Sequence, residues 1–214
     1  YFNLLEILTH IVHSEKVLNM KRLLLILILT LSFQSLAKAD DIRDFQIEGM
    51  SIGDSVLDYV SKDEIKVGEN NSTFMRNKDG ATRFIIIFLK SLPKKNYEQI
   101  QVTYKYKDKE YIIHSIDGVT KFVDDFEGCK KKKKIIVKDL KKIFKDAKLN
   151  EVEKKHEADK SGKSTHSSSY LNLNSGQVQV WCTNWSSEVQ WTNSLMVSLN
   201  SKEYRDFLIN EAYK

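Results

Sequence analysis

Polar and apolar positions alternate with a period of two in several parts of the chain, which is the pattern of β-strands that bury one face. The clearest stretch covers residues 99–116, and its apolar members include Ile100, Val102, Tyr104 and Tyr106. Polar residues at 107–110 interrupt the alternation. This stretch therefore predicts two antiparallel strands joined by a short turn.

Further strands are predicted on both sides of this hairpin. Residues 83–90 contain the continuous apolar run FIIIFL, which is typical of a strand covered on both faces. Ser169–Leu173 and Gln177–Asn184 flank a turn of Asn, Ser and Gly, and they predict a second hairpin. One more strand is indicated by the alternating residues Leu195, Val197 and Leu199.

Two other segments lack the alternation and predict a turn and a loop. Asp117-Gly118 is a dipeptide common in turns, so the second strand of the first hairpin is expected to end before it. Residues 150–169 are polar and carry no periodicity. They predict an exposed loop.

The segment 129–147, CKKKKKIIVKDLKKIFKDA, has the spacing of a helix with one apolar side. The residues on that side are Cys129, Ile136, Leu140, Ile143, Phe144 and Ala147. Lysines cover the remaining surface. A closing helix is predicted over Ser201–Tyr213, with Asn200 and Glu203 in a capping-box-like start.

Together these elements predict an α+β fold. We expect an antiparallel sheet of hairpins, packed in two layers by the lysine-rich amphipathic helix and by the C-terminal helix. Residues 40–214 have the size of one domain.

The first part of the chain is typical of a secretory signal peptide. Met20-Lys21-Arg22 precedes an apolar run that ends at Phe33, and Ala37-Lys38-Ala39 has the small residues of a cleavage site. The apolar run is shorter than the roughly 20 residues that span a bilayer. We therefore predict a signal peptide over 20–39, cleaved after Ala39, and export to the periplasm. Residues 1–19 are interpreted as a non-native upstream extension.

Export changes the interpretation of the two cysteines. Two cysteines in an exported chain form one disulfide more readily than they stay free. Cys129 lies on the apolar side of the predicted helix, and Cys182 shares a strand face with Val178 and Val180. A Cys129–Cys182 bond would stabilise the fold by about 4 kcal/mol in the chain-entropy description. The alternatives are two separately buried thiols or an intermolecular bridge.

Three strings of the chain resemble an uncharacterised family of small exported proteins from Pelagibacter-type marine alphaproteobacteria. They are IEGMSIGDSVLDYVSKDEI (47–65), HEADKSGKST (156–165) and VWCTNWSSE (180–188). The resemblance covers most of 20–214 and agrees with a start at Met20. It implies a periplasmic location and supplies no catalytic residues.

A run of five lysines at the start of the predicted helix is the strongest charge feature of a chain whose net charge is +5. The run consists of Lys130, Lys131, Lys132, Lys133 and Lys134. An ordinary solvated helix face explains it. The functional alternative is an anion-binding surface for an anionic envelope component or an acidic protein. Export removes nucleic acid as a partner, and signal cleavage would leave no transmembrane anchor.

Histidines and tryptophans are the remaining candidates for a site. His156 and His166 lie in the polar segment 150–169, but their spacing matches no familiar metal motif. Surface histidines are the simpler interpretation. The tryptophans Trp181, Trp185 and Trp191 form either a binding face for sugars or peptides, or a packing layer beneath the closing helix.

No stretch has the pattern of a catalytic motif such as G-x-S-x-G, and a disulfide would leave no free cysteine. We therefore assign no catalytic residue, metal ligand or cofactor. The preferred hypothesis is a periplasmic protein with a non-catalytic binding or structural role in the cell envelope. The alternatives are an envelope hydrolase with a site in 150–169, and an adaptor whose lysine helix binds anionic surfaces.

Overall fold

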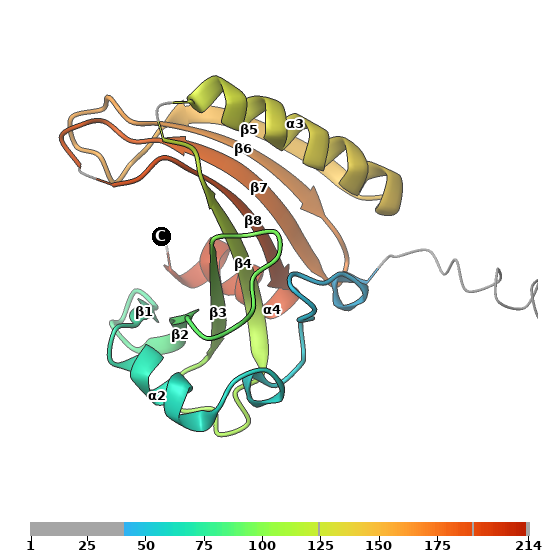
Figure 1. Ribbon diagram of the computed structural model, residues 1–214, viewed down its shortest axis with the longest axis vertical. Helices are drawn as coiled ribbons and strands as arrows, with labels where there is room; N and C mark the ends of the chain where they lie inside the picture. Colours follow the sequence, from blue (N-terminus) through green and yellow to red (C-terminus); the bar gives the residue numbers. More distant parts are fainter. Residues whose placement is uncertain (1–40, 124, 190, 213–214) are drawn as a thin grey trace, which may run out of the picture. The chain divides into compact units, whose positions relative to one another are not determined.

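The computed structural model describes residues 41–123, 125–189 and 191–212, so the predictions for 1–19 and 20–39 lie outside the described residues. Within them, eight strands form one antiparallel sheet in the order β1-β2-β3-β4-β8-β7-β6-β5 (Figure 1). The strands are β1 Thr73–Arg76, β2 Thr82–Leu89, β3 Gln99–Lys105, β4 Ile113–Lys121, β5 Lys148–Lys155, β6 Thr165–Asn172, β7 Gly176–Asn184 and β8 Ser194–Ser201. Two meanders, β1–β4 and β5–β8, are thus joined where β4 pairs with β8.

The helices of the described residues pack on this sheet. The helix α2 (Lys62–Glu69) packs on β2, and α3 (Phe126–Ile143) runs across β6 and β7. The short helix α4 (Lys202–Phe207) continues into a π-helical turn, η3 (Leu208–Ala212), and contacts β4, β7 and β8. Figure 1 shows α3 and α4 on opposite sides of β7 and β8. The predicted two-layer α+β fold is confirmed, and α4 additionally covers one end of the second sheet face.

One face of the sheet carries the hydrophobic core. Its buried members from β4, β7 and β8 are Ile116, Val178, Val180, Leu195, Val197 and Leu199. The helix α3 and the segment 42–60 cover this face. Two 3-10 turns, η1 (Ile42–Asp44) and η2 (Val56–Asp58), shape that segment. Burial of each such side chain stabilises the fold by roughly 1.5–3 kcal/mol.

The predicted disulfide between Cys129 and Cys182 is confirmed. It joins the first turn of α3 to β7, with the two Cα atoms 6.0 Å apart, a usual separation for such a bond. Both residues are buried on the apolar face. The bond is consistent with an oxidising compartment outside the cytoplasm.

The buried stripe of α3 differs in part from the predicted one. Its buried residues are Cys129, Lys133, Val137 and Leu140. Ile143 is 43 % exposed, because the buried positions follow spacings of four, four and three residues from the disulfide to Leu140, and the next buried position is Phe144. Phe144 and Ala147 are buried as expected, but they follow the end of the helix at Ile143.

Two segments expected to be a turn and a loop are strands. Most of 150–169 forms the hairpin of β5 and β6. The edge strand β5 is exposed on both sides, so it has no hydrophobic period to detect. Asp117-Gly118 lies inside β4. A Cβ on Gly118 would lie 2.6 Å from the ring of Tyr97, so this glycine permits a packing contact rather than a turn.

The C-terminal helix begins one residue later than predicted. Asn200 still belongs to β8, and the hydroxyl of Ser201 accepts the first capping bond, from the Tyr204 amide at 3.1 Å. Tyr204 and Phe207 pack against Phe84 on the second face of the sheet. None of the described helices is long and apolar enough to cross a membrane.

Candidate functional site

The second face of the sheet carries polar side chains in register. One row across the described strands β3, β4, β8, β7 and β6 consists of Gln101, Asp117, Ser198, Gln179 and Tyr170. The neighbouring row consists of Thr103, Ser115, Asn200, Gln177 and Asn172. Side chains directly opposite each other in such rows lie about 5 Å apart. The rows therefore form a continuous polar surface at the centre of the sheet.

This polar surface is hollowed. A cavity of about 600 Å³ lies over it, within the range of roughly 300–1,000 Å³ that is usual for small-molecule sites. Polar members of the two rows form its floor. Its walls include the apolar and aromatic residues Met75, Ile86, Trp181, Met196, Leu208 and Ile209. Apolar walls around a few fixed polar groups are typical of sites for small organic molecules.

Asp117 is a buried carboxyl group in the middle of this floor. It is 8 % exposed, and it forms no ion pair among the described residues. Its Oδ1 accepts hydrogen bonds from the hydroxyls of Ser198 and Ser115. Burial raises the pKa of Asp117 to about 6, although the two hydroxyls oppose the shift. At neutral pH the floor therefore contains a carboxylate, and no described side chain donates to its Oδ2.

The hydroxyl hydrogens of the floor are already used. Ser115 also lies 2.7 Å from Oδ1 of Asn200, and Ser198 lies 3.3 Å from the same oxygen. Each hydroxyl has a single hydrogen to donate. Thr103 and Ser168, which face the same side, keep buried hydroxyls without a partner among the described residues. A buried polar group without a partner lowers the free energy of unfolding by about 1–3 kcal/mol. The described residues therefore leave part of the hydrogen-bonding capacity of this face unused.

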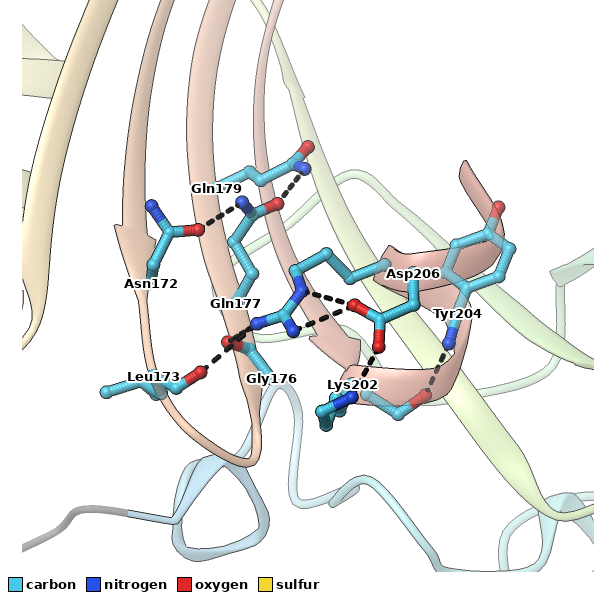
Figure 2. Close-up of polar contacts among 10 residues, drawn as sticks. Asn172, Leu173, Gly176, Gln177, Gln179, Lys202, Tyr204 and Asp206 are labelled. Atoms are coloured by element: carbon cyan, nitrogen blue, oxygen red, sulfur yellow. Dashed lines mark hydrogen bonds and ion pairs between the residues drawn. The ribbon is translucent and has the colours of Figure 1, made fainter. Parts of the chain in front are cut away.

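The helix α4 closes one end of the cavity and is fixed by Arg205. The Nη1 atom of Arg205 donates to the carbonyl oxygens of Leu173 and Gly176, both at 3.1 Å, in the β6–β7 turn (Figure 2). Asp206 accepts from Arg205 at Oδ1 and from Lys202 at Oδ2. The helix and the turn therefore hold each other in place, and this wall is pre-formed.

A chain of side-chain amides leads from that turn into the cavity. Gln177 donates to Oδ1 of Asn172 at 2.6 Å, and Gln179 donates to Oε1 of Gln177 (Figure 2). Gln179 also lines the cavity. The chain fixes the orientation of the Gln179 amide at the cavity wall.

Two imidazoles lie at the other end of the cavity. The rings of His156 and His166 are edge to face, with centroids 5.4 Å apart, and His166 lies 6.1 Å from Trp181. Burial, with a smaller contribution from His156, lowers the pKa of His166 to about 4, and burial also lowers the pKa of His156. Both rings are therefore neutral at pH 7. The described residues contain no cluster of three or more metal-ligating side chains.

The structure places the three tryptophans differently from one another. Trp181 lies on the strand face opposite Cys182, as expected, and lines the cavity. Trp185 contacts the ring of His156 at 4.2 Å and that of Trp191 at 4.5 Å. Trp191 is 56 % exposed. Trp185 and Trp191 thus sit beside the histidine end of the cavity, at the end of β7 away from α4.

The lysine run of α3 lies against the other face of the sheet. The exposed members are Lys131, Lys132 and Lys134. Lys130 pairs with Glu127 at 2.7 Å. Lys133 is buried, with its Nζ donating to the hydroxyl of Ser167 at 3.0 Å, so the interpretation of all five lysines as a solvated face is wrong at this position. Its long stem packs along the buried stripe while the ammonium reaches a partner. Anion binding by the others stays a prediction.

Sequence reasoning missed the floor of the cavity. Asp117 was assigned to a turn, and the serines and amides of β7 and β8 resemble the polar side of an exposed strand. One signal was available. The strand β5, which is exposed, is rich in lysine and glutamate, whereas the polar positions of β7 and β8 carry only hydroxyls and amides apart from Trp181 and Met196. Short uncharged polar side chains are the ones that a protein can bury with hydrogen bonds.

Comparisons of the chain with protein-family models, with curated proteins and with solved structures gave no match. The resemblance to small exported proteins stays a prediction.

Proposed function

We propose that this protein is a periplasmic, non-catalytic binding protein that holds a small organic molecule in the cavity over the polar face of the sheet. The observation that supports this proposal is the buried polar floor beneath a cavity of about 600 Å³. A sheet face that serves stability alone is either apolar and covered or polar and open to water. This face is polar and partly enclosed, which is the composition of a ligand site.

The energetics of the floor support the same proposal. Asp117 is buried without a counter-ion among the described residues, and its Oδ2 accepts no hydrogen bond from them. Groups of this kind destabilise a fold unless something pairs with them. A bound molecule that supplies donors to Asp117 would gain the hydrogen-bond energy that the protein leaves unused.

The arrangement of nucleophile and base candidates favours binding over hydrolysis. His114 lies 3.1 Å from the hydroxyl of Ser201 and 3.9 Å from Glu203, but both contacts are made at the same nitrogen, Nδ1. In a catalytic triad the serine and the carboxylate contact opposite nitrogens of the imidazole ring. The Nδ1 atoms of His156 and His166 face the Ala158 amide and Thr183, respectively. The contacts of His114, His156 and His166 therefore do not form the serine–histidine–carboxylate arrangement of a triad with any described serine.

The proposed location rests on the disulfide and on two predictions from the sequence. The Cys129–Cys182 bond is consistent with an oxidising compartment. The signal peptide predicted over 20–39 and the resemblance to small exported proteins both point to the periplasm. A ligand-binding role there requires no nucleotide or other cytosolic cofactor.

The proposal is tested by screening small organic molecules with amide NMR on the purified protein with its disulfide intact. We expect binding molecules to shift the amide resonances of those residues in β4, β7 and β8 whose side chains line the cavity. Trp181→Ala should weaken binding at least tenfold, because it removes an aromatic wall of the cavity. Trp191→Ala is the matched control, since Trp191 does not line the cavity. Shifts confined to the α3 side, or equal effects of the two variants, would contradict the proposal.

A further inference from the structure

The carboxylate of Asp117 is the feature of the cavity that distinguishes one class of ligand from another. It lines the cavity floor and is 8 % exposed. An unpaired buried charge is strongly destabilising, whereas the same charge with a partner is tolerated. A counter-ion that arrives with the ligand would explain why the carboxylate is present.

The protein does not supply this counter-ion from its described residues. Lys105 on β3 pairs with Glu203 of α4 at 2.8 Å. His114 on β4 also lies against Glu203, at 3.9 Å, and burial lowers its pKa. The in-row neighbours of Asp117, Gln101 and Ser198, are uncharged. The carboxylate therefore faces the cavity with its charge uncompensated.

The hydrogen bonds around Asp117 favour a ligand group that donates hydrogen bonds over one that accepts them. Oδ1 of Asp117 accepts from Ser198 and Ser115, and Oδ2 is without a hydrogen bond from the described residues. The same two hydroxyls lie against Oδ1 of Asn200, so their hydrogens are already directed at oxygen atoms. An ammonium group has three donors and no acceptor. It matches this floor better than a carboxylate, a phosphate or a carbonyl does.

The walls fit the rest of an organic cation. Trp181 and Met196 lie in the row next to that of Asp117, on β7 and β8. Trp181 on β7 lies two strands from β4, a lateral separation of about 10 Å, and Met196 on β8 lies between them, so an apolar skeleton extending from Asp117 would meet Met196 and then Trp181. An aromatic wall also attracts a cation. Because the pKa values of His156 and His166 are lowered, these rings add no positive charge that would repel it.

We infer that the cavity selects a primary amine on an apolar skeleton, with the ammonium group paired to Asp117 and the skeleton against Trp181 and Met196. This inference rests on the proposed function of the cavity as a ligand site. The pairing is an equilibrium contact, so no bond is formed or broken. The ligand class that this pairing defines is the small organic cation.

The test compares amines and alcohols that share a skeleton. The probes are phenethylamine with phenethyl alcohol, and tryptamine with tryptophol, each titrated at pH 7.5 and followed by amide NMR. We expect the amines to bind in the cavity at least tenfold more tightly than the alcohols. Asp117→Asn should remove this preference while leaving the alcohols unaffected. Asp63→Asn, which removes a carboxylate with a 96 % exposed side chain on α2, should keep it.

The outcomes separate the two proposals. If alcohols and amines bind the cavity equally, or if Asp117→Asn keeps the preference for amines, the amine inference is wrong and the binding function stands. If neither set binds, the amine inference is wrong, and the proposed function is then decided by the wider screen of small organic molecules. Should Asp117→Asn not fold, Asp117→Ser with the same titrations replaces it. A titration of the Asp117 carboxyl by carbon NMR is independent of any variant, and amine binding should lower its pKa.

Discussion

The two faces of the sheet are built from the same strands, but one face carries the apolar core and the other carries the polar floor of the cavity. On β8, Leu195, Val197 and Leu199 are buried in the core beneath α3, whereas Ser198 and Asn200 alternate with them and are buried on the cavity side. The first set gains stability from burial, and the second set is buried at a cost. Neighbouring positions of a single strand therefore separate the residues that stabilise the core from those that line the cavity of the proposed binding site.

The faces also differ in how they are held. The apolar face is cross-linked to α3 by the disulfide. The cavity face is covered at one end by α4, which is held by the hydrogen bonds of Arg205 to the β6–β7 turn. This difference predicts that variants on the two faces have unequal effects on the free energy of unfolding.

The largest effect is expected from removing the disulfide. Replacing both cysteines, Cys129→Ser with Cys182→Ser, should lower the free energy of unfolding by about 4 kcal/mol, because the bond closes a loop of 53 residues in sequence separation. Urea denaturation of the variant and of the oxidised protein measures it. A change below about 1 kcal/mol would show that the link between α3 and β7 is held by packing alone.

The next effect compares two neighbours on β8. Leu199→Ala should cost about 3 kcal/mol, because Leu199 is fully buried in the core. Ser198→Ala should cost about 1.5 kcal/mol, because it removes a hydrogen bond to the buried carboxylate of Asp117 but leaves little empty space. Both are measured by urea denaturation at pH 7.5. Similar losses would mean that the cavity face contributes to stability as much as the core face does.

Asp117→Asn is expected to stabilise the protein. The pKa of Asp117 is raised from 3.8 to about 6 on folding, so the folded state binds this proton more tightly than the unfolded state does. Ionisation therefore removes stability as the pH rises through this window, and the full loss is present above it. A difference of about two pH units corresponds to about 3 kcal/mol. Allowing for weaker hydrogen bonds to the amide, we expect a gain of about 2 kcal/mol at pH 7.5.

The gain should shrink to less than half at pH 5, because most of the carboxyl is then protonated in the folded protein, whose Asp117 has a pKa of about 6. Denaturation of both proteins at the two pH values provides this comparison. A variant that is less stable than the parent at pH 7.5 would show that the protein itself satisfies the carboxylate. Asp63→Asn should change stability little at either pH, because the side chain of Asp63 is exposed.

The smallest effect is expected at the α4 anchor. Arg205→Ala should cost about 1 kcal/mol and speed hydrogen exchange in α4, because it removes two hydrogen bonds to the β6–β7 turn. Arg83→Ala removes an exposed ion pair with Glu211 in the following turn, η3, and should have no measurable effect. Unchanged exchange in α4 after Arg205→Ala would show that Tyr204 and Phe207 alone hold this wall of the cavity.

The sequence predicts the core side of this protein well. Its apolar residues recur at strand and helix spacing, and Cys182 shares a face with Val178 and Val180, so the disulfide follows from pattern and compartment. It predicts β5 poorly, because an exposed edge strand carries no hydrophobic period. It also places Lys133 on the wrong side of α3, since local spacing does not tell which stripe faces the sheet when lysine can reach a buried hydroxyl.

By itself, the sequence determined the strands that bury apolar side chains, the lysine-rich helix and the cross-link, because burial of apolar side chains imposes a local period that is visible along the chain. Only the tertiary structure decided that Asp117, Ser198 and Gln179 form one row. Register between strands distant in sequence is set by packing of the opposite face, where a slip of one residue would expose the core. The polar residues of this row alternate along their strands as they would on a face open to water. Whether they line a cavity depends on α4, which covers one end of this face only in the folded protein.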